Sequence, residues 1–409
     1  DVISFPFFCF LSMNGISIFT LTSSLHDEAS VSRISDEFLD SVLPDGYDFR
    51  GADLSTFGDH DLDLIFVRTG GSEGLFKAAL PTLLDKGIRR FHLLTSGKSN
   101  SLAASMEILS YLNNNGLSGE IIHGPAAYVS SRIKVLATVE AAKKKLTGLR
   151  LGVVGKPSDW LIASDADYDA VRSKLGIELV DIPMEALLDR HESASEENAP
   201  DLPMAPDVRS SFPGATMIYN ALRSIIEDYR LGGFTIRCFD LLTSVHNTGC
   251  LALSRLNSQG FPSGCEGDVP ALLSMAITNS ITGVSGFQAN PSRIDVSSGE
   301  ILFAHCTIPF NMVSSFVFDT HFESGIGVGI RGHFDEGPVT VFKVSGDLSR
   351  AFIAEGTILR NQAEADLCRT QIILKVSPEE ARYFLTDPIG NHHIIMPGHN
   401  AGILREILQ

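Results

Sequence analysis

Short β-rich runs alternate with longer helical patterns through the first part of the chain. The runs at residues 16–21, 62–67 and 91–95 each end at a polar or glycine-rich loop. Residues 75–86 and 101–114, which follow two of these runs, show the spacing of apolar positions expected of helices. Strands that alternate with helices predict a parallel sheet with helices on both faces.

A second unit with the same alternation begins near Gly148. An apolar run at residues 149–155 predicts its first strand, and residues 179–182 form another strand candidate. Residues 192–207 are acidic and rich in proline, which is typical of an exposed connection. We therefore expect a second parallel sheet.

The pattern changes from about Phe234 onward. Short runs recur at residues 301–304, 339–344 and 370–376, and glycines are frequent between the first two of these runs. Short strands separated by glycine-rich turns predict an antiparallel barrel or sandwich.

These changes predict three domains and an α/β fold class. Residues 1–147 are expected to form an amino-terminal α/β domain and residues 148–233 a second one, both Rossmann-like with parallel sheets. Residues 234–409 are expected to form a carboxy-terminal domain that contains an antiparallel β-barrel.

The composition is that of a globular protein with substantial cores. The 409 residues are 44% apolar and 20% charged, which is ordinary for such a chain. The formal net charge of −17 argues against nucleic acid and anionic membrane surfaces as partners, because both carry negative charge. A small molecule remains compatible with this charge.

The cysteines indicate a reducing environment. Six are present without C-x-x-C spacing: Cys9, Cys238, Cys250, Cys265, Cys306 and Cys368. Scattered cysteines in a chain of this length are typical of reduced thiols in the cytoplasm, which is the expected location.

The opening residues 1–12 are apolar, lack a basic region and are too short to cross a bilayer. We therefore expect neither a signal peptide nor a membrane helix there. The preferred interpretation places the natural start at Met13. The alternative is that the opening residues pack as an extra strand or a subunit contact.

Polar residues interrupt the apolar pattern of the carboxy-terminal region. Glu266 follows a small-residue turn, and a predicted helix over residues 269–281 ends at Gly283. Asn290 ends the next predicted strand. An acid at a helix start and an amide at the end of a neighbouring strand can converge on one ligand.

Two further polar clusters follow, A-H-C at residues 304–306 and G-N-H-H at residues 390–393. Carboxylate, amide and imidazole groups together suit a divalent ion such as Mn²⁺ or Mg²⁺. A structural zinc site would instead show paired Cys or Cys and His at short spacing.

Four motifs in this order resemble the L-fucose isomerase/L-arabinose isomerase superfamily. They are C-E-G-D at residues 265–268, F-Q-A-N at 287–290, A-H-C at 304–306 and G-N-H-H-x-x-x-x-G-H at 390–399. Members of this superfamily interconvert aldoses and ketoses on a bound Mn²⁺, and they have two α/β domains followed by a β-barrel domain. The resemblance implies that residues 234–409 form the catalytic domain.

The resemblance also implies a metal site. Glu266, Asn290 and His392 match the family's ligand positions, and His305 matches a histidine ligand of the arabinose-isomerase branch. Glu266 could instead cap the following helix, and His305 could be a hydrogen-bonded core residue. We assign the first three as ligands of Mn²⁺, or of another divalent cation such as Mg²⁺, and keep His305 as a further candidate ligand.

Glu266 and Asp268 are the candidate catalytic residues, with Asp268 also able to cap the helix or support the site. Trp160, the only tryptophan, could stack on a sugar or pack in the core or at an interface. His393 and His399 are candidate substrate contacts. On a strand, however, His393 would face the opposite side from its preceding neighbour.

One position departs from the family pattern. Family isomerases carry Asp or Glu where this chain has Asn290. An amide can lend its carbonyl oxygen to a metal, but it cannot accept a proton as a carboxylate does. The standard reaction would therefore need another acid–base group.

The main interpretation is a metal-dependent aldose–ketose isomerase that acts on a free monosaccharide through an enediolate. One alternative is the same scaffold acting on a sulfonated or phosphorylated sugar, and another is a non-catalytic sugar-binding relative. The family also implies a homo-oligomer, trimeric or hexameric.

Overall fold

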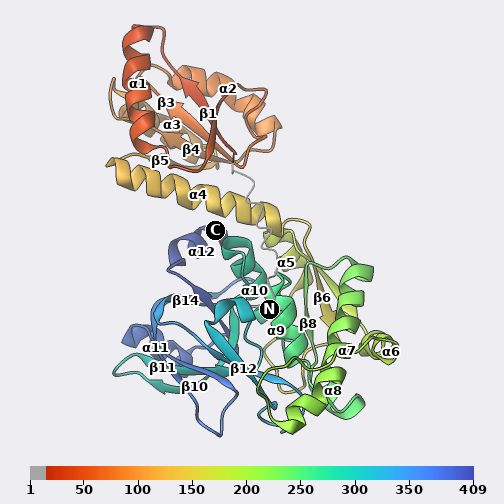
Figure 1. Cartoon of the computed structure of the whole chain (residues 1–409). Helices are drawn as coiled ribbons and strands as arrows, with labels where there is room; N and C mark the ends of the chain where they lie inside the picture. The colour runs from red at the N-terminus through yellow and green to blue at the C-terminus, as the bar shows by residue number, and fades with distance from the viewer. Residues whose placement is uncertain (1–14) are drawn as a thin grey trace. The chain divides into compact units, whose positions relative to one another are not determined.

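The computed structural model describes residues 15–409, and the chain divides after Ala141 into two compact units. Figure 1 shows the chain coloured from its amino terminus to its carboxy terminus. The expectations for residues 1–12 and the thiol of Cys9 lie outside the described residues.

The first unit contains a parallel sheet with the strand order β2-β1-β3-β4-β5, and Figure 1 labels four of these strands, β1, β3, β4 and β5. Its strands are β1 (Gly15–Leu21), β2 (Asp48–Ala52), β3 (Leu62–Val67), β4 (Arg90–Leu94) and β5 (Ser118–Ile122). Its helices are α1 (Glu28–Val42), α2 (Glu73–Asp85), α3 (Ser101–Asn114) and α4 (Ala126–Leu146), the last of which continues past the unit boundary. The strands and helices expected from the alternating pattern are all present.

Apolar side chains on both faces of this sheet account for its helical cover. On one face, Leu64 packs in a cluster with Ile133 of α4. On the other face, Ile65 packs with Phe76 of α2 and Ile108 of α3. A parallel sheet whose strands are apolar on both faces needs such cover to exclude water.

The second unit contains a parallel sheet with the strand order β7-β6-β8-β9. Its strands are β6 (Arg150–Val154), β7 (Glu178–Ile182), β8 (Gly233–Ile236) and β9 (Ser263–Gly264). The accompanying helices are α5 (Tyr168–Leu175), α6 (Met184–Glu192), α7 (Pro206–Tyr229), α8 (Asp240–Ser244), α9 (Cys250–Ser258) and α10 (Val269–Thr282). Strands β8 and β9 place part of this sheet after residue 233.

A closed antiparallel barrel follows, with the strand order β10-β11-β16-β15-β14-β17. Its strands are β10 (Phe287–Asp295), β11 (Glu300–His305), β14 (Gly337–Val344), β15 (Ala351–Gln362), β16 (Thr370–Lys375) and β17 (His393–Pro397). A separate ribbon pairs β12 (Ser315–Asp319) with β13 (Gly329–His333), and η1 (Phe310–Met312), α11 (Pro378–Thr386) and α12 (Ala401–Ile407) complete the unit.

The predicted fold class is confirmed: two parallel α/β sheets precede an antiparallel barrel. The helix expected over residues 269–281 is α10, and Gly283 ends it in the left-handed conformation with φ 77°. None of the described helices is both long enough and apolar enough to cross a membrane.

Helix α10 contacts strands of both the parallel sheet and the barrel, since it packs against β8, β9, β14 and β17. The barrel strands near its start are in fixed register: Asn290 pairs with Ala304, and Ala289 pairs with His393. The end of β9, the start of α10 and one end of three barrel strands therefore lie together.

The turn between β9 and α10 adopts an unusual backbone conformation. Glu266 has a φ of 64°, in the left-handed region, and Gly267 follows with a φ of 72°. The side chain of Gln288 accepts a hydrogen bond from Cys265 N at 2.9 Å and donates one to Cys265 O at 3.3 Å. The backbone N–H of Ser158 also donates to Glu266 O at 2.9 Å. These contacts hold a conformation that costs a non-glycine residue about 1–2 kcal/mol.

Replacing Gly267 should disrupt this turn. In Gly267→Ala the added Cβ would overlap the carbonyl oxygen of Lys156 and approach Cα of Pro157. Gly260→Ala is a matched control, because Gly260 also has a positive φ but has no neighbouring atom within 4 Å of the added Cβ. We expect the control to cost about 1–2 kcal/mol of unfolding free energy and Gly267→Ala to cost at least about 1 kcal/mol more. Denaturant unfolding measures both; equal losses would contradict the steric role of the turn.

Candidate metal centre

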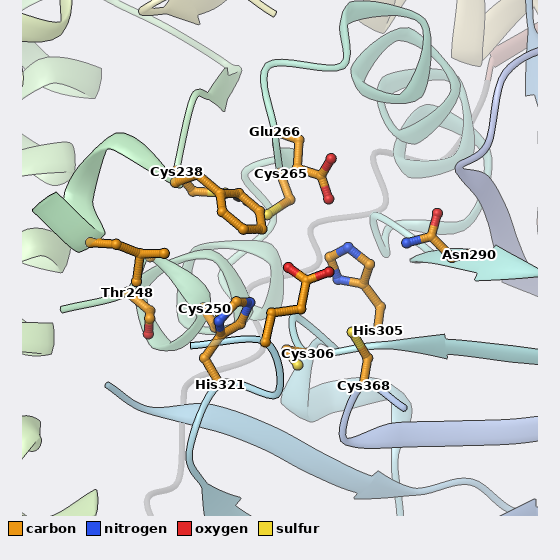
Figure 2. A pocket seen from close by; sticks show the side chains of 14 residues that line it. Cys238, Thr248, Cys250, Cys265, Glu266, Asn290, His305, Cys306, His321 and Cys368 are labelled. Carbon is orange, nitrogen blue, oxygen red and sulfur yellow. Dashed lines mark hydrogen bonds between the residues drawn. The ribbon is translucent and has the colours of Figure 1, made fainter. Parts of the chain in front are cut away.

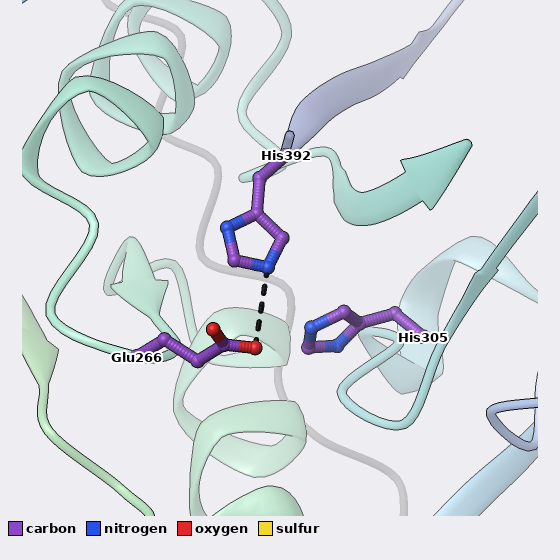
Figure 3. Close-up of side chains that lie close together, drawn as sticks. All are labelled: Glu266, His305 and His392. Carbon is purple, nitrogen blue, oxygen red and sulfur yellow. Dashed lines mark ion pairs between the residues drawn. The ribbon is translucent and has the colours of Figure 1, made fainter. Parts of the chain in front are cut away.

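Three buried side chains converge in the second unit: Glu266, His305 and His392 (Figure 3). One possible ligand atom of each lies within 4.8 Å of the other two. Glu266 comes from the turn after β9, His305 from the end of β11, and His392 immediately precedes β17. His392 Nε2 and Glu266 Oε1 are 3.4 Å apart.

The ligand atoms that these side chains leave available fit a divalent ion. His392 Nε2 is buried and has no hydrogen-bond partner among residues 15–409. In His305, Nδ1 forms a hydrogen bond with Thr307 Oγ1 at 2.9 Å. The second ring nitrogen of His305, Nε2, is therefore left to bind a metal ion. Metal–ligand distances of about 2.0–2.2 Å place neighbouring ligand atoms roughly 3–3.5 Å apart, so the separation of Glu266 and His392 suits a shared ion.

His392 is oriented by a buried carboxylate. Its Nδ1 lies 2.9 Å from Asp268 Oδ2, so an Nδ1–H donor directs Nε2 toward Glu266. Asp268 caps α10 by accepting a hydrogen bond from Ala271 N at 2.8 Å. Lys343 of β14 donates to both oxygens of Asp268 at 3.1 Å. A carboxylate behind a ligating histidine fixes the ring and raises its basicity.

The charges of this network reinforce one another. Burial raises the pKa of Asp268, but Lys343 and His392 outweigh burial and hold that pKa well below its usual range. Burial also raises the pKa of Glu266, but the contacts with His392 and Trp160 lower it to about 2. Both carboxyl groups are therefore ionised at neutral pH, and together they attract positive charge to the space between them.

The two histidines respond to this field differently. Burial lowers the pKa of His392, but Asp268 and Glu266 outweigh burial and raise it to about 9, so a metal ion that binds Nε2 would displace a proton from it. Burial lowers the pKa of His305 to about 3, and the charge of His392 contributes to the lowering. His305 is thus a neutral imidazole, the form in which histidine binds metals.

Trp160 lies beside Glu266. Its indole Nε1–H donates a hydrogen bond to Glu266 Oε2 at 2.7 Å, and its ring meets Phe239 edge to face with centroids 4.9 Å apart. The residue is still 52% exposed. An aromatic side chain that is anchored to the site and open to solvent can contact a ligand.

A cavity opens next to these residues (Figure 2). Glu266, His305 and Asn290 line it, and the side-chain oxygen of Asn290 accepts a hydrogen bond from Asn391 Nδ2 at 3.1 Å. The remaining lining residues are Cys238, Phe239, Leu242, Thr248, Gly249, Cys250, Cys265, Cys306, His321, Glu323 and Cys368. Five thiols therefore border the cavity, and the sulfur atoms of two, Cys238 and Cys265, are 2.9 Å apart.

Two candidate substrate residues lie elsewhere. His393 is buried in an aromatic cluster with Phe352 and Phe384, and its Nε2 is 3.1 Å from the hydroxyl of Tyr383. His399 lies against β15, where its Nε2 is 3.2 Å from Gly356 O. Neither residue lines the cavity.

Sequence reasoning missed several residues around the site. Lys343 is the one charged residue in the apolar run of β14. A single charge in a buried strand indicates a buried ion pair, so the sequence pattern could have revealed this residue. Glu323 and His321 lie in the loop between β12 and β13, which carries no motif. The thiols come from segments far apart in the chain, so only the fold brings them to one cavity.

The donor set predicts which variants lose metal. Glu266→Gln, His305→Ala and His392→Ala should each weaken Mn²⁺ binding at least about tenfold, because each removes a ligand. Isothermal titration calorimetry on the folded variants measures this. His399→Ala, which changes a partly exposed histidine outside the cavity, should bind Mn²⁺ like the unaltered protein. Unchanged affinity in the three site variants would rule out this metal centre.

The buried ion pair makes a separate prediction about stability. Lys343 and Asp268 have side chains only 1% and 0% exposed. Lys343→Met should lower the free energy of unfolding by about 3–5 kcal/mol, because it leaves a buried carboxylate without its cation. Adding Asp268→Asn should restore part of that loss. Lys375→Met, on an exposed position of β16, should stay within about 0.5 kcal/mol of the unaltered protein. A small effect at Lys343 would show that His392 alone compensates Asp268.

Comparison with known proteins identifies distant relatives. The chain is 25% identical over 213 residues to the sulfoquinovose isomerase of Clostridium sp. (strain MSTE9), which covers 48% of this chain and 45% of the relative. It is 24% identical over 232 residues to that of Alkalicoccus urumqiensis, covering 54% and 51% respectively. The match to that of Priestia aryabhattai is 22% over 295 residues, covering 67% and 64%.

No family model matches the chain. The first two matches span about half the length of those curated relatives. The chain is therefore a distant homologue of sulfoquinovose isomerases, which bears out the sugar-isomerase resemblance in its broad form.

Proposed function

We propose that this protein is a metal-dependent aldose–ketose isomerase that acts on a sulfonated hexose. The observation that carries the proposal is the buried group of Glu266, His305 and His392 beside an open cavity. The relatives, all sulfoquinovose isomerases, favour the modified-sugar alternative over a neutral monosaccharide.

Glu266 is the proposed proton acceptor. Its ionised carboxylate has one oxygen, Oε2, held by the indole N–H of Trp160 and the other, Oε1, facing His392. A base that is ionised and fixed in position can take the proton from the carbon next to a sugar carbonyl. A bound divalent ion would supply electrostatic stabilisation of the negative charge that develops on the sugar oxygens.

The donor set suits Mn²⁺ better than Mg²⁺. Two imidazole nitrogens and one carboxylate are typical of transition-metal sites, whereas Mg²⁺ prefers oxygen ligands throughout. Asn290, on the same cavity, offers an amide oxygen as a further neutral ligand. We therefore propose Mn²⁺ as the cofactor, held by Glu266, His305 and His392.

The non-catalytic alternative rests on Asn290, because the amide replaces a carboxylate that family isomerases use. A binding protein would retain sugar without exchanging its C2 proton for solvent deuterium. Exchange followed by NMR therefore separates a binding protein from an enzyme.

A sulfonate group is an anion, and a lysine or arginine would bind it through charge-assisted hydrogen bonds. The cavity lining includes neither Lys nor Arg among the described residues. Lys156 is exposed, forms no hydrogen bond or ion pair with a described residue, and has its backbone packed against Gly267 next to Glu266. We propose that the ammonium group of Lys156 binds the sulfonate, because this residue lies beside the turn that carries Glu266 and its ammonium group has no partner among the described residues.

The substrate assignment predicts a charge preference. With Mn²⁺, the protein should isomerise 6-sulfonated glucose at least about tenfold more efficiently than glucose, since an ion pair to the sulfonate contributes on the order of 1.4 kcal/mol. Lys156→Gln should raise KM for the sulfonated sugar and leave kcat and the reaction of glucose unchanged. Lys375→Gln removes an exposed lysine of the barrel and is the matched control. Equal efficiency for the two sugars would contradict the sulfonated substrate.

A further inference from the structure

The proposed isomerisation needs two kinds of proton transfer, one at carbon and one at oxygen. Asn290 occupies the position where isomerases of the superfamily that this chain resembles have a carboxylate, and its amide cannot act as a general acid or base at neutral pH. In the structure its oxygen accepts a hydrogen bond from Asn391. The second acid–base group must therefore come from another position.

Nearby carboxyl groups are mostly engaged elsewhere. Asp268 is fully buried and bonded to Lys343, His392 and Ala271 N. Asp240 is paired with Arg237 at 3.0 Å. Neither lines the cavity.

Glu266 and Glu323 are the only acidic residues among the described residues that line the cavity. Glu323 forms no ion pair and no hydrogen bond with any described side chain or backbone group through its carboxylate. It interacts electrostatically with Glu266 and with Cys368. An unengaged carboxyl group at the cavity is available to a ligand.

The loop that carries Glu323 is held in place. The backbone N–H of His321 donates to Ile326 O at 2.9 Å, and His321 Nδ1 lies 2.9 Å from Ser324 Oγ. At the far end of the loop, Val328 N donates to Thr248 Oγ1 at 3.2 Å. His321 and Thr248 both line the cavity (Figure 2). Glu323 is thus presented from a loop anchored at the cavity wall.

We infer that Glu323 is the second acid–base residue of this site and moves protons between the O1 and O2 atoms of the sugar. This inference rests on the proposed isomerase function. Glu323, from the loop between β12 and β13, would then carry out the proton transfer that Asn290 cannot perform.

The proton transfers balance. Glu266 takes the proton from C2, the C2–H electron pair becomes the C1=C2 bond, and the C1=O π pair moves to O1, which takes the proton of Glu323. Ionised Glu323 then takes the proton from O2, and that O–H pair becomes the C2=O bond. The C1=C2 pair takes the proton from Glu266 at C1. Both carboxyl groups return to their starting states, and no oxidant or reductant is needed.

Burial and the charge of Glu266 raise the pKa of Glu323, which favours its proton-bearing form as the acid of the first oxygen transfer.

The test compares two rates in Glu323→Gln: isomerisation, and exchange of the C2 proton with solvent deuterium followed by NMR. Loss of the oxygen-side proton carrier should lower kcat for isomerisation at least about 100-fold and lower C2 exchange less than tenfold, because Glu266 remains. Affinity for Mn²⁺, measured by calorimetry, should change less than threefold. Glu336→Gln removes an exposed carboxylate near the start of β14 and should leave both rates unchanged.

A parallel fall of the two rates, or no change in either, with Mn²⁺ affinity retained, would overturn the role of Glu323 and leave the proposed function standing. Absence of isomerisation by the unaltered protein would overturn the proposed function and this inference together. Asn290→Asp added to Glu323→Gln should recover at least tenfold of the lost isomerisation. If the double variant binds Mn²⁺ but does not recover isomerisation, positions 290 and 323 do not serve the same proton-transfer step.

Discussion

The second unit depends on the contacts that the buried carboxylate of Asp268 makes. This carboxylate caps α10, accepts two hydrogen bonds from Lys343 of the barrel and orients His392. One side chain thus ties a helix that packs on the parallel sheet to two strands of the barrel. Buried charges are costly unless fully paired, so the arrangement of these three residues is strongly constrained. The orientation of His392 in the candidate metal centre follows from that constraint.

The sequence was sufficient for the layers and for part of the site. Alternating strand and helix patterns, and a later change to short glycine-separated runs, predicted two parallel sheets and a barrel. The helix over residues 269–281 was readable because its apolar positions and Gly283 mark both its course and its end. Glu266, His305 and His392 came from motifs, and the structure places them within reach of one ion.

The rest depended on contacts between distant segments. Lys343 is 75 residues from Asp268 in sequence, and no local sequence pattern predicts that they form an ion pair. Glu323 lies in an irregular loop whose course is set by hydrogen bonds to Thr248 and within the loop itself. Adjacent histidines show the same limit: the register of β17 with β10 sends His393 into an aromatic cluster, while His392 faces Glu266.

The single tryptophan gives this protein a built-in optical reporter. Indole emission depends on the polarity and hydrogen bonding around the ring, and here the indole N–H is bonded to Glu266 while the ring is half exposed. With no second tryptophan in the chain, the whole signal arises at one place. Rearrangement of the Glu266 carboxylate or shielding of the ring by a ligand would therefore register directly in the fluorescence of the unlabelled protein.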